Sequence, residues 1–203
     1  FNGEYHQALK NSNLIADFGF TEGYKKTSDI KTKGSKSHFF AKFNKDFFGK
    51  NNSQNTLNLS TQQVSDDKYL KLYKIKSNIV DYNNDTLENS LSFTHENDDL
   101  FFGVNANIYE NLKDNYNDKY EYILPEITID KNLTRSRNFG DLGLQTNLKV
   151  HNHDTNKQNS FLVNDINWRS NSIISKFGFN SNILGNIKNI NYDSKNDTTY
   201  KDE

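Results

Sequence analysis

Apolar and polar residues alternate one by one along several segments of this chain. In the clearest run the apolar residues are Leu100, Phe102, Val104, Ala106 and Ile108. Small or polar residues occupy positions 103, 105 and 107 between them, and similar alternation occupies residues 39–44, 56–61 and 142–150. Alternation with a period of two is typical of a strand with one buried and one wet face, and helical spacing does not fit these windows.

Polar segments separate the alternating runs and predict turns or loops. They are residues 31–36, 50–54, 83–85, 97–99, 113–118 and 153–158. Counting the runs between them predicts roughly eleven strands, many of about ten residues. Strands in soluble sheets usually have about five or six residues, whereas strands that cross an outer membrane at a tilt need about 9–11. The strand length therefore favours a membrane-spanning sheet over a soluble sandwich.

Two segments depart from the simple alternation. Residues 67–75 fit either a short helix, striped by Tyr69, Leu72 and Tyr73, or a strand, and the pattern leaves both open. The single proline, Pro125, lies inside an otherwise strand-like run. Because proline cannot donate a ladder hydrogen bond, it predicts weak pairing or a bulge at that point.

The composition supports an ordered, half-wet sheet. Hydrophobic residues make up 33% of the chain and mean hydropathy is -0.93, yet there are 15 Phe and 11 Tyr. Disordered chains are poor in aromatic residues, so disorder is excluded. The 25 basic and 26 acidic residues leave a net charge of -1. A nucleic-acid binder would show a basic face, so nucleic acid is not expected as a partner.

The sequence predicts that the 203 residues are part of one larger domain. It has no Cys and no Met and begins with Phe1, which indicates a processed product or an internal fragment. No leader is recognisable, and no apolar run approaches the ~20 residues of a membrane-spanning helix. A helical membrane protein is therefore not expected.

Candidate catalytic chemistry is sparse. The sequence has no Gly-rich phosphate loop, no Gly-x-Ser-x-Gly elbow and no His-Glu-x-x-His motif, so we expect no enzyme activity and no cofactor. His151 and His153 would share one face of a strand, which is suggestive of a metal. We interpret them instead as a polar strand end that runs into a loop, and we expect no metal site.

Several stretches resemble the lipopolysaccharide-assembly outer-membrane protein family (LptD, or organic solvent tolerance protein). The first, residues 54–73, reads QNTLNLSTQQVSDDKYLKLY and is similar to an early-barrel strand followed by a Ser-Asp-x-x-Tyr/Phe-Leu segment. The second, residues 119–127, reads KYEYILPEI and is similar to a strand with a leucine shortly before a proline. The third comprises residues 161–168 (FLVNDINW) and 188–194 (KNINYDS). Together they cover most of the chain.

This resemblance implies a fold and a function. Family members form a barrel of antiparallel transmembrane strands in the outer membrane, with a plug lipoprotein of the LptE type inside. They receive lipopolysaccharide from periplasmic bridge proteins and release it into the outer leaflet through a seam between the first and last strands. No bond chemistry is involved. The prolines that weaken the seam have no match here, so the seam and the periplasmic domain are expected outside this chain.

The resemblance and the alternation together predict an all-β, open part of a large transmembrane barrel. A sheet of about eleven strands would leave polar edges in lipid, so further strands must close it. We expect Leu100, Phe102, Val104, Ala106 and Ile108 to face outer-membrane lipid, and Asn105 and Asn107 to face the lumen or the plug.

Two other classes fit the same alternation. One is another outer-membrane barrel, such as a porin or a receptor-type transporter, for which an upstream plug sequence would be diagnostic. The other is a soluble extracellular β-protein such as an adhesin or solenoid, which would be extracted without detergent.

Overall fold

The chain forms a large antiparallel sheet in a computed structural model. The structure describes residues 1–22, 24–27, 30–50, 52–113, 118–154, 156–197 and 199. No helix among them is long and apolar enough to span a membrane. The sequence-based prediction of an all-β chain is confirmed at this level.

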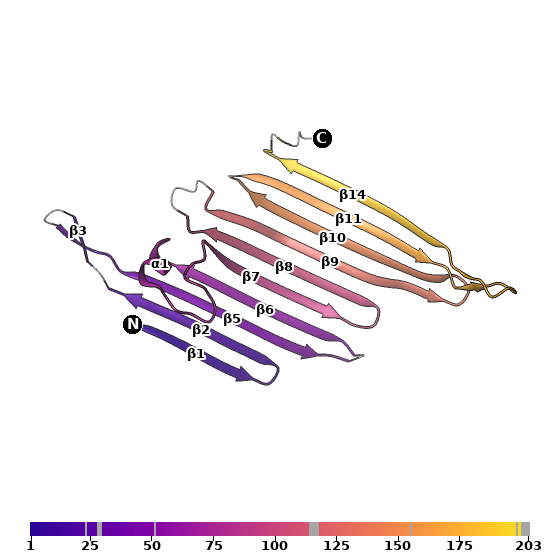
Figure 1. Cartoon of the computed structure of the whole chain (residues 1–203), viewed down its shortest axis with the longest axis horizontal. Coiled ribbons are helices and arrows are strands. Elements are labelled where there is room, and N and C mark those ends of the chain that lie inside the picture. The colour runs from indigo at the N-terminus through magenta and orange to yellow at the C-terminus, as the bar shows by residue number, and fades with distance from the viewer. Residues whose placement is uncertain are drawn as a thin grey trace.

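The main sheet has ten strands (Figure 1). Their spatial order across the sheet is the same as their order along the chain. In spatial order they are β1 (Asn2–Leu9), β2 (Ser12–Thr21), β5 (Lys36–Phe48), β6 (Gln54–Val64), β7 (Thr86–Glu96), β8 (Leu100–Asn111), β9 (Tyr120–Ser136), β10 (Gly140–His153), β11 (Lys157–Arg169) and β14 (Leu184–Lys195). All neighbours are antiparallel. In the described residues β1 and β14 are the two edges, so the sheet is open (Figure 1).

Smaller elements interrupt the meander. A hairpin of β3 (Tyr24–Thr27) and β4 (Ile30–Lys33) lies between β2 and β5, and β12 (Ile173–Ile174) pairs with β13 (Asn180–Ser181) between β11 and β14. The predicted turn at 31–36 was therefore partly wrong, because its first residues continue a strand. The ambiguous segment 67–75 contains a short helix, α1 (Tyr69–Tyr73). Residues 114–117 of the predicted loop 113–118 lie outside the described residues.

Asparagine side chains and backbones build several tight turns. Asn11 takes a φ of 58° between β1 and β2, a left-handed conformation that Asn adopts more readily than most residues. Between β7 and β8 the Asn97 side-chain oxygen accepts hydrogen bonds from the backbone N–H groups of Asp99 (3.0 Å) and Leu100 (2.9 Å). These local bonds explain why Asn-rich segments end the strands.

Pro125 disturbs the pairing of β9 on both sides, as its chemistry predicts. The register with β8 shifts between Asn105 and Asn107, and the register with β10 shifts between Lys149 and His151. The predicted bulge is confirmed, and β9 nevertheless continues through it as the longest strand, at 17 residues.

The buried apolar cluster is small and lies at one end of the sheet. It contains Phe40, Tyr69, Leu70, Val80, Leu87 and Leu112. It forms where β6 and β7 separate beyond the pair Ser60 and Ser90 and the connection 65–85 folds back. Most of the sheet is therefore one layer thick, and large apolar side chains remain exposed on it.

Candidate functional site: the two faces of the sheet

Cross-strand partners share a face of a sheet, so the register assigns each side chain to one side. One row of partners runs through Leu57, Phe93, Val104, Ile127, Leu148 and Leu162. We call this side the apolar face. The five residues expected to face lipid (Leu100, Phe102, Val104, Ala106 and Ile108) all lie on this face of β8; what covers them remains a prediction.

The apolar face extends over most of the sheet. Its further large members are Leu14, Phe18 and Phe20 of β2, Phe39, Phe43 and Phe47 of β5, Leu59 of β6, Leu91 of β7, Ile129 of β9, Leu142 and Leu144 of β10, and Ile166 and Trp168 of β11. Many are solvent-exposed, for example Leu91 at 48% and Leu59 at 43%. A contiguous exposed apolar surface of this kind marks contact with a membrane or with another protein.

Aromatic pairs lie near both ends of the apolar face. The rings of Phe139 and Trp168 are 5.6 Å apart between centroids, and the Trp168 indole N–H donates to the Phe139 carbonyl at 2.8 Å. Near the other end Tyr120 and Tyr122 of β9 lie with ring centroids 6.2 Å apart. Amphipathic aromatic rings at the two borders of an apolar band are typical of outer-membrane barrels.

The opposite side, which we call the polar face, carries hydrogen-bonding groups that contact one another across strands. The neighbouring row of partners runs through Asn44, Asn58, Ser92, Asn105, Glu126 and Lys149. The Asn58 amide donates to the Ser92 hydroxyl at 3.1 Å, and the Gln145 amide donates to Asp130 at 2.8 Å. A face of this kind is suited to water and polar ligands.

Shallow hollows on the polar face have polar linings. One of them, of about 580 Å³, is lined by residues that include Asp130, Gln145, Asn167, Arg169 and Asn186. These side chains supply hydrogen-bond donors and acceptors. The hollow can therefore bind polar groups through hydrogen bonds.

The two faces exchange their chemistry near the β14 edge. The apolar row ends on Asn191, the partner of Leu162, whereas the polar row ends on Phe161 and Tyr192, whose ring centroids are 4.8 Å apart. Polar groups also enter the apolar face at Thr146, whose hydroxyl donates to Asn164 at 2.9 Å. Toward the chain end of β14 the side that is apolar elsewhere is therefore polar.

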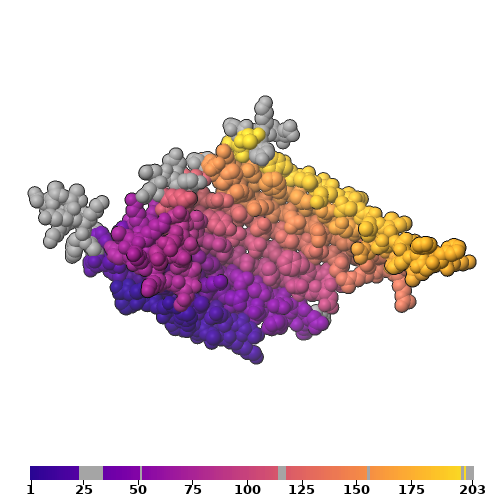
Figure 2. Space-filling view, in the orientation of Figure 1, coloured from indigo at the N-terminus to yellow at the C-terminus, as the bar shows by residue number. Residues whose placement is uncertain are grey.

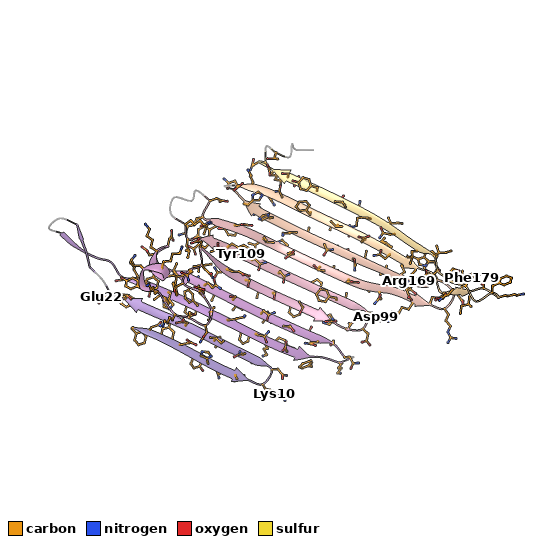
Figure 3. All side chains as sticks on the ribbon, in the orientation of Figure 1. Lys10, Glu22, Asp99, Tyr109, Arg169 and Phe179 are labelled. Carbon is orange, nitrogen blue, oxygen red and sulfur yellow. The ribbon has the colours of Figure 1, made fainter. Side chains whose placement is uncertain are left out.

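The connections differ between the two ends of the sheet. Figure 3 places Lys10, Asp99 and Arg169 at one end and Glu22 and Tyr109 at the other. We call the first end the turn end; its connections are residues 10–11, 49–53, 97–99, 137–139 and 170–183. We call the second end the loop end; its connections are residues 22–35, 65–85, 112–119 and 154–156. All connections at the turn end are short except 170–183.

A buried polar chain lies beneath α1 on the polar face. The His38 ring approaches Asp17 Oδ1 through Nε2 at 3.2 Å and the Tyr69 hydroxyl through Nδ1 at 3.2 Å. Asp17 and Tyr69 are each 1% exposed and His38 is 4% exposed. The second carboxylate oxygen of Asp17 is buried and has no hydrogen-bond partner among the described residues. Sequence reasoning missed this site, because His38 stands 21 and 31 residues from its partners.

Ion pairs surround the connection 65–85 at the loop end. Lys36 lies 2.7 Å from Asp66, and its hydrogen bond is the main reason that the Asp66 pKa is lowered. Lys119 lies 2.8 Å from Asp67 and 3.0 Å from Glu110. The hydrogen bond to Asp67 is the main reason that the pKa of Lys119 is raised. Lys71 pairs with Asp85, whose pKa is lowered chiefly by that hydrogen bond.

His151 and His153 share the polar face, as their spacing predicted. Their rings stack at 4.6 Å between centroids, and His151 lies 2.6 Å from the Glu121 carboxylate. The Asn159 amide nitrogen lies within hydrogen-bond distance of His153 Nε2, at 3.0 Å. Across the described part of the chain, no group of three or more His, Asp or Glu side chains is arranged to hold a metal ion.

No protein-family model, curated protein or solved structure matches this chain.

Proposed function

We propose that this chain is part of the wall of a large outer-membrane β-barrel. The apolar face meets lipid and the polar face lines a wet interior. The observation that carries the proposal is the segregation of the two faces across neighbouring strands: Phe93, Val104 and Ile127 share one side, and Ser92, Asn105 and Glu126 share the other. Exposing apolar side chains to water costs roughly 25 cal/mol of free energy per Å², so contact with lipid would stabilise the apolar face.

Strand length and the open edges support the same proposal. The central strands β5 to β11 have from 11 to 17 residues, enough to cross an outer membrane at a tilt. The backbone groups along the outer sides of β1 and β14 have no strand partner within the described residues. In lipid each such group would cost several kcal/mol, so further strands would complete the wall.

The connections suggest an orientation. Outer-membrane barrels have short periplasmic turns and longer extracellular loops. The turn end would therefore face the periplasm and the loop end, with 22–35 and 65–85, the outside. The connection 170–183 is the exception, because it is long and lies at the turn end.

Within this class we propose a role in lipopolysaccharide assembly. The support is the resemblance of residues 54–73, 119–127, 161–168 and 188–194 to the LptD family. The protein would then place lipopolysaccharide in the outer leaflet, with a plug lipoprotein of the LptE type and periplasmic bridge proteins as partners. It would act by offering separate apolar and wet surfaces to one amphipathic molecule, without making or breaking bonds.

Depletion of the intact gene product tests the proposed role. Newly made lipopolysaccharide should stop reaching the cell surface, as measured by its access to a surface-acting lipid-modifying enzyme. The level of an unrelated outer-membrane barrel serves as the control. Unchanged surface lipopolysaccharide would favour a porin or a receptor-type transporter, and an intact product that stays in the soluble fraction without detergent would contradict the barrel itself.

A further inference from the structure

The connection 65–85 folds back over one end of the sheet (Figure 2). Near its tip the Asn78 amide donates to the Glu4 carboxylate on β1 at 2.6 Å. Glu4 is the cross-strand partner of Asp17 and shares the polar face with it. Ile79 lines a hollow of about 360 Å³ together with residues that include Lys42, Ser60 and Glu88. The connection therefore covers part of the surface that would line the interior.

The first anchor of this connection is the buried polar chain. In the neutral tautomer that carries its hydrogen on Nε2, the His38 ring donates a hydrogen bond to Asp17 and accepts one from the Tyr69 hydroxyl at Nδ1, which satisfies both ring nitrogens. Asp17 comes from β2 and His38 from β5, so Tyr69 fastens α1 to two strands of the wall. Breaking this contact would leave buried polar groups without partners, which is unfavourable.

The second anchor is apolar and holds both halves of the connection. Leu70, at 1% exposure, and Val80, at 3%, belong to one cluster with Phe40 of β5 and Leu87 of β7. In contrast Leu72, on the other side of α1, is 64% exposed. Tyr73 packs against the anchor, because its ring centroid lies 5.2 Å from that of Tyr69. The helix therefore has a buried side turned to the wall and an exposed side turned away from it.

We propose that residues 65–85 are a fixed constriction that narrows the wet interior and limits the passage of polar solutes along this part of the wall. This inference rests on the proposed barrel and adds a barrier role to it. Anchors at α1, at Val80 and at Asn78 distribute the attachment along the connection, as expected of a permanent obstruction. A loop for extracellular docking would instead project from the loop end.

Ion conductance through the purified intact protein, with its co-purifying partners, in planar lipid bilayers tests the constriction. The variant Tyr69→Ala/Leu70→Ser removes both anchors of α1. The control Leu72→Ser makes the same leucine-to-serine change on the exposed side of the same helix. We expect at least a twofold rise in conductance for the anchor variant and less than a 1.2-fold change for the control, as working thresholds. Equal conductance of the two variants would overturn the constriction.

A disulfide test does not depend on the folding of the anchor variant. The chain has no cysteine, so Glu4→Cys/Asn78→Cys introduces one clean cross-link at the tip of the connection. In the otherwise unchanged protein, oxidation and reduction should give the same conductance, because the connection is already in place. In the anchor variant, oxidation should restore the low conductance. A drop on oxidation of the otherwise unchanged protein would show a mobile gate and overturn the fixed constriction.

A separate measurement tests whether the protein forms a barrel at all. Heat-modifiable migration on a gel reports whether each variant forms a folded barrel, whatever its conductance. A protein that never shows this behaviour and never enters a bilayer would contradict the proposed function, and the constriction would be overturned with it. A folded, inserted anchor variant with unchanged conductance would contradict the constriction alone.

Discussion

Val104 of β8 lies directly opposite Phe93 of β7, and the next residue along β8, Asn105, lies opposite Ser92 on the other face. One step along the strand thus moves a side chain from the apolar to the polar environment. The contrast between these two neighbouring positions provides a direct test of the environment of each face.

A lysine at position 104 should be far more harmful than a lysine at position 105. If the apolar face meets lipid, Val104→Lys should lower the free energy of unfolding by roughly 2–4 kcal/mol, the cost of a mid-membrane charge. Asn105→Lys, which enters the wet side, should cost much less. Urea unfolding of the intact protein in lipid vesicles measures both, and equal losses would contradict the assignment of faces.

Tyr69→Phe should loosen the connection 65–85 without unfolding the sheet. The substitution leaves His38 Nδ1 buried without its donor, which costs about 1–3 kcal/mol locally. Tyr73→Phe is the control and should have no effect, because it keeps the ring that packs against Tyr69 and removes only the hydroxyl. Hydrogen–deuterium exchange should show faster exchange in residues 65–85 for the first variant, with β8 unchanged; identical exchange in both variants would argue against the buried chain.

Gly19 leaves room for the His38 ring. A Cβ added there would lie 2.3 Å from His38 Cε1, closer than real contacts allow. Gly19→Ala should therefore destabilise the protein by about 1–3 kcal/mol, the usual cost of overpacking. At Gly143, also in a strand on the polar face, the nearest atom would be 3.9 Å away. Gly143→Ala should be tolerated, and the same unfolding measurement compares the two.

The ion pairs around 65–85 predict a dependence on pH. The Asp66 pKa is lowered from 3.8 mainly by the hydrogen bond from Lys36, so its contribution is present above that value and lost as the pH falls through the lowered folded-state value. The Lys119 pKa is raised from 10.5, so its contribution is present below that value and lost only as the pH rises through the raised value. Proteolysis of 65–85 should stay constant between neutral and mildly alkaline pH and increase in strong acid.

The variant Lys36→Gln provides the control for this pH dependence. It removes the main cause of the lowered Asp66 pKa, so the connection should be somewhat more accessible at neutral pH and should change less on acidification. An acid-stable protease active across the range measures cleavage in both proteins. An equally steep rise of cleavage with acidification in both proteins would show that the Lys36–Asp66 pair does not set the acid response.

The sequence predicted the parts of the fold that depend on local chemistry. Alternation assigned every second residue from Leu100 to Ile108 to one face, and Pro125 marked the bulge in β9. It left residues 67–75 open between a short helix and a strand, because the buried side of α1 is defined by Phe40 and Leu87 on distant strands. The same holds for His38, which looks like any half-polar strand residue until the meander brings Asp17 and Tyr69 to it.

If the sheet is part of a membrane-spanning wall, the polar residues near the end of β14 would determine where hydrocarbon can meet it. Beside β8 the apolar side chains continue from Leu100 to Ile108, but along β14 they stop at Ile187, before Asn189, Asn191 and Asp193. Lipid next to β14 would have a shorter apolar height to match, and bilayers adapt to a short span by thinning. The outer leaflet would dip at this edge and bring its headgroups and their water closer to the centre of the bilayer.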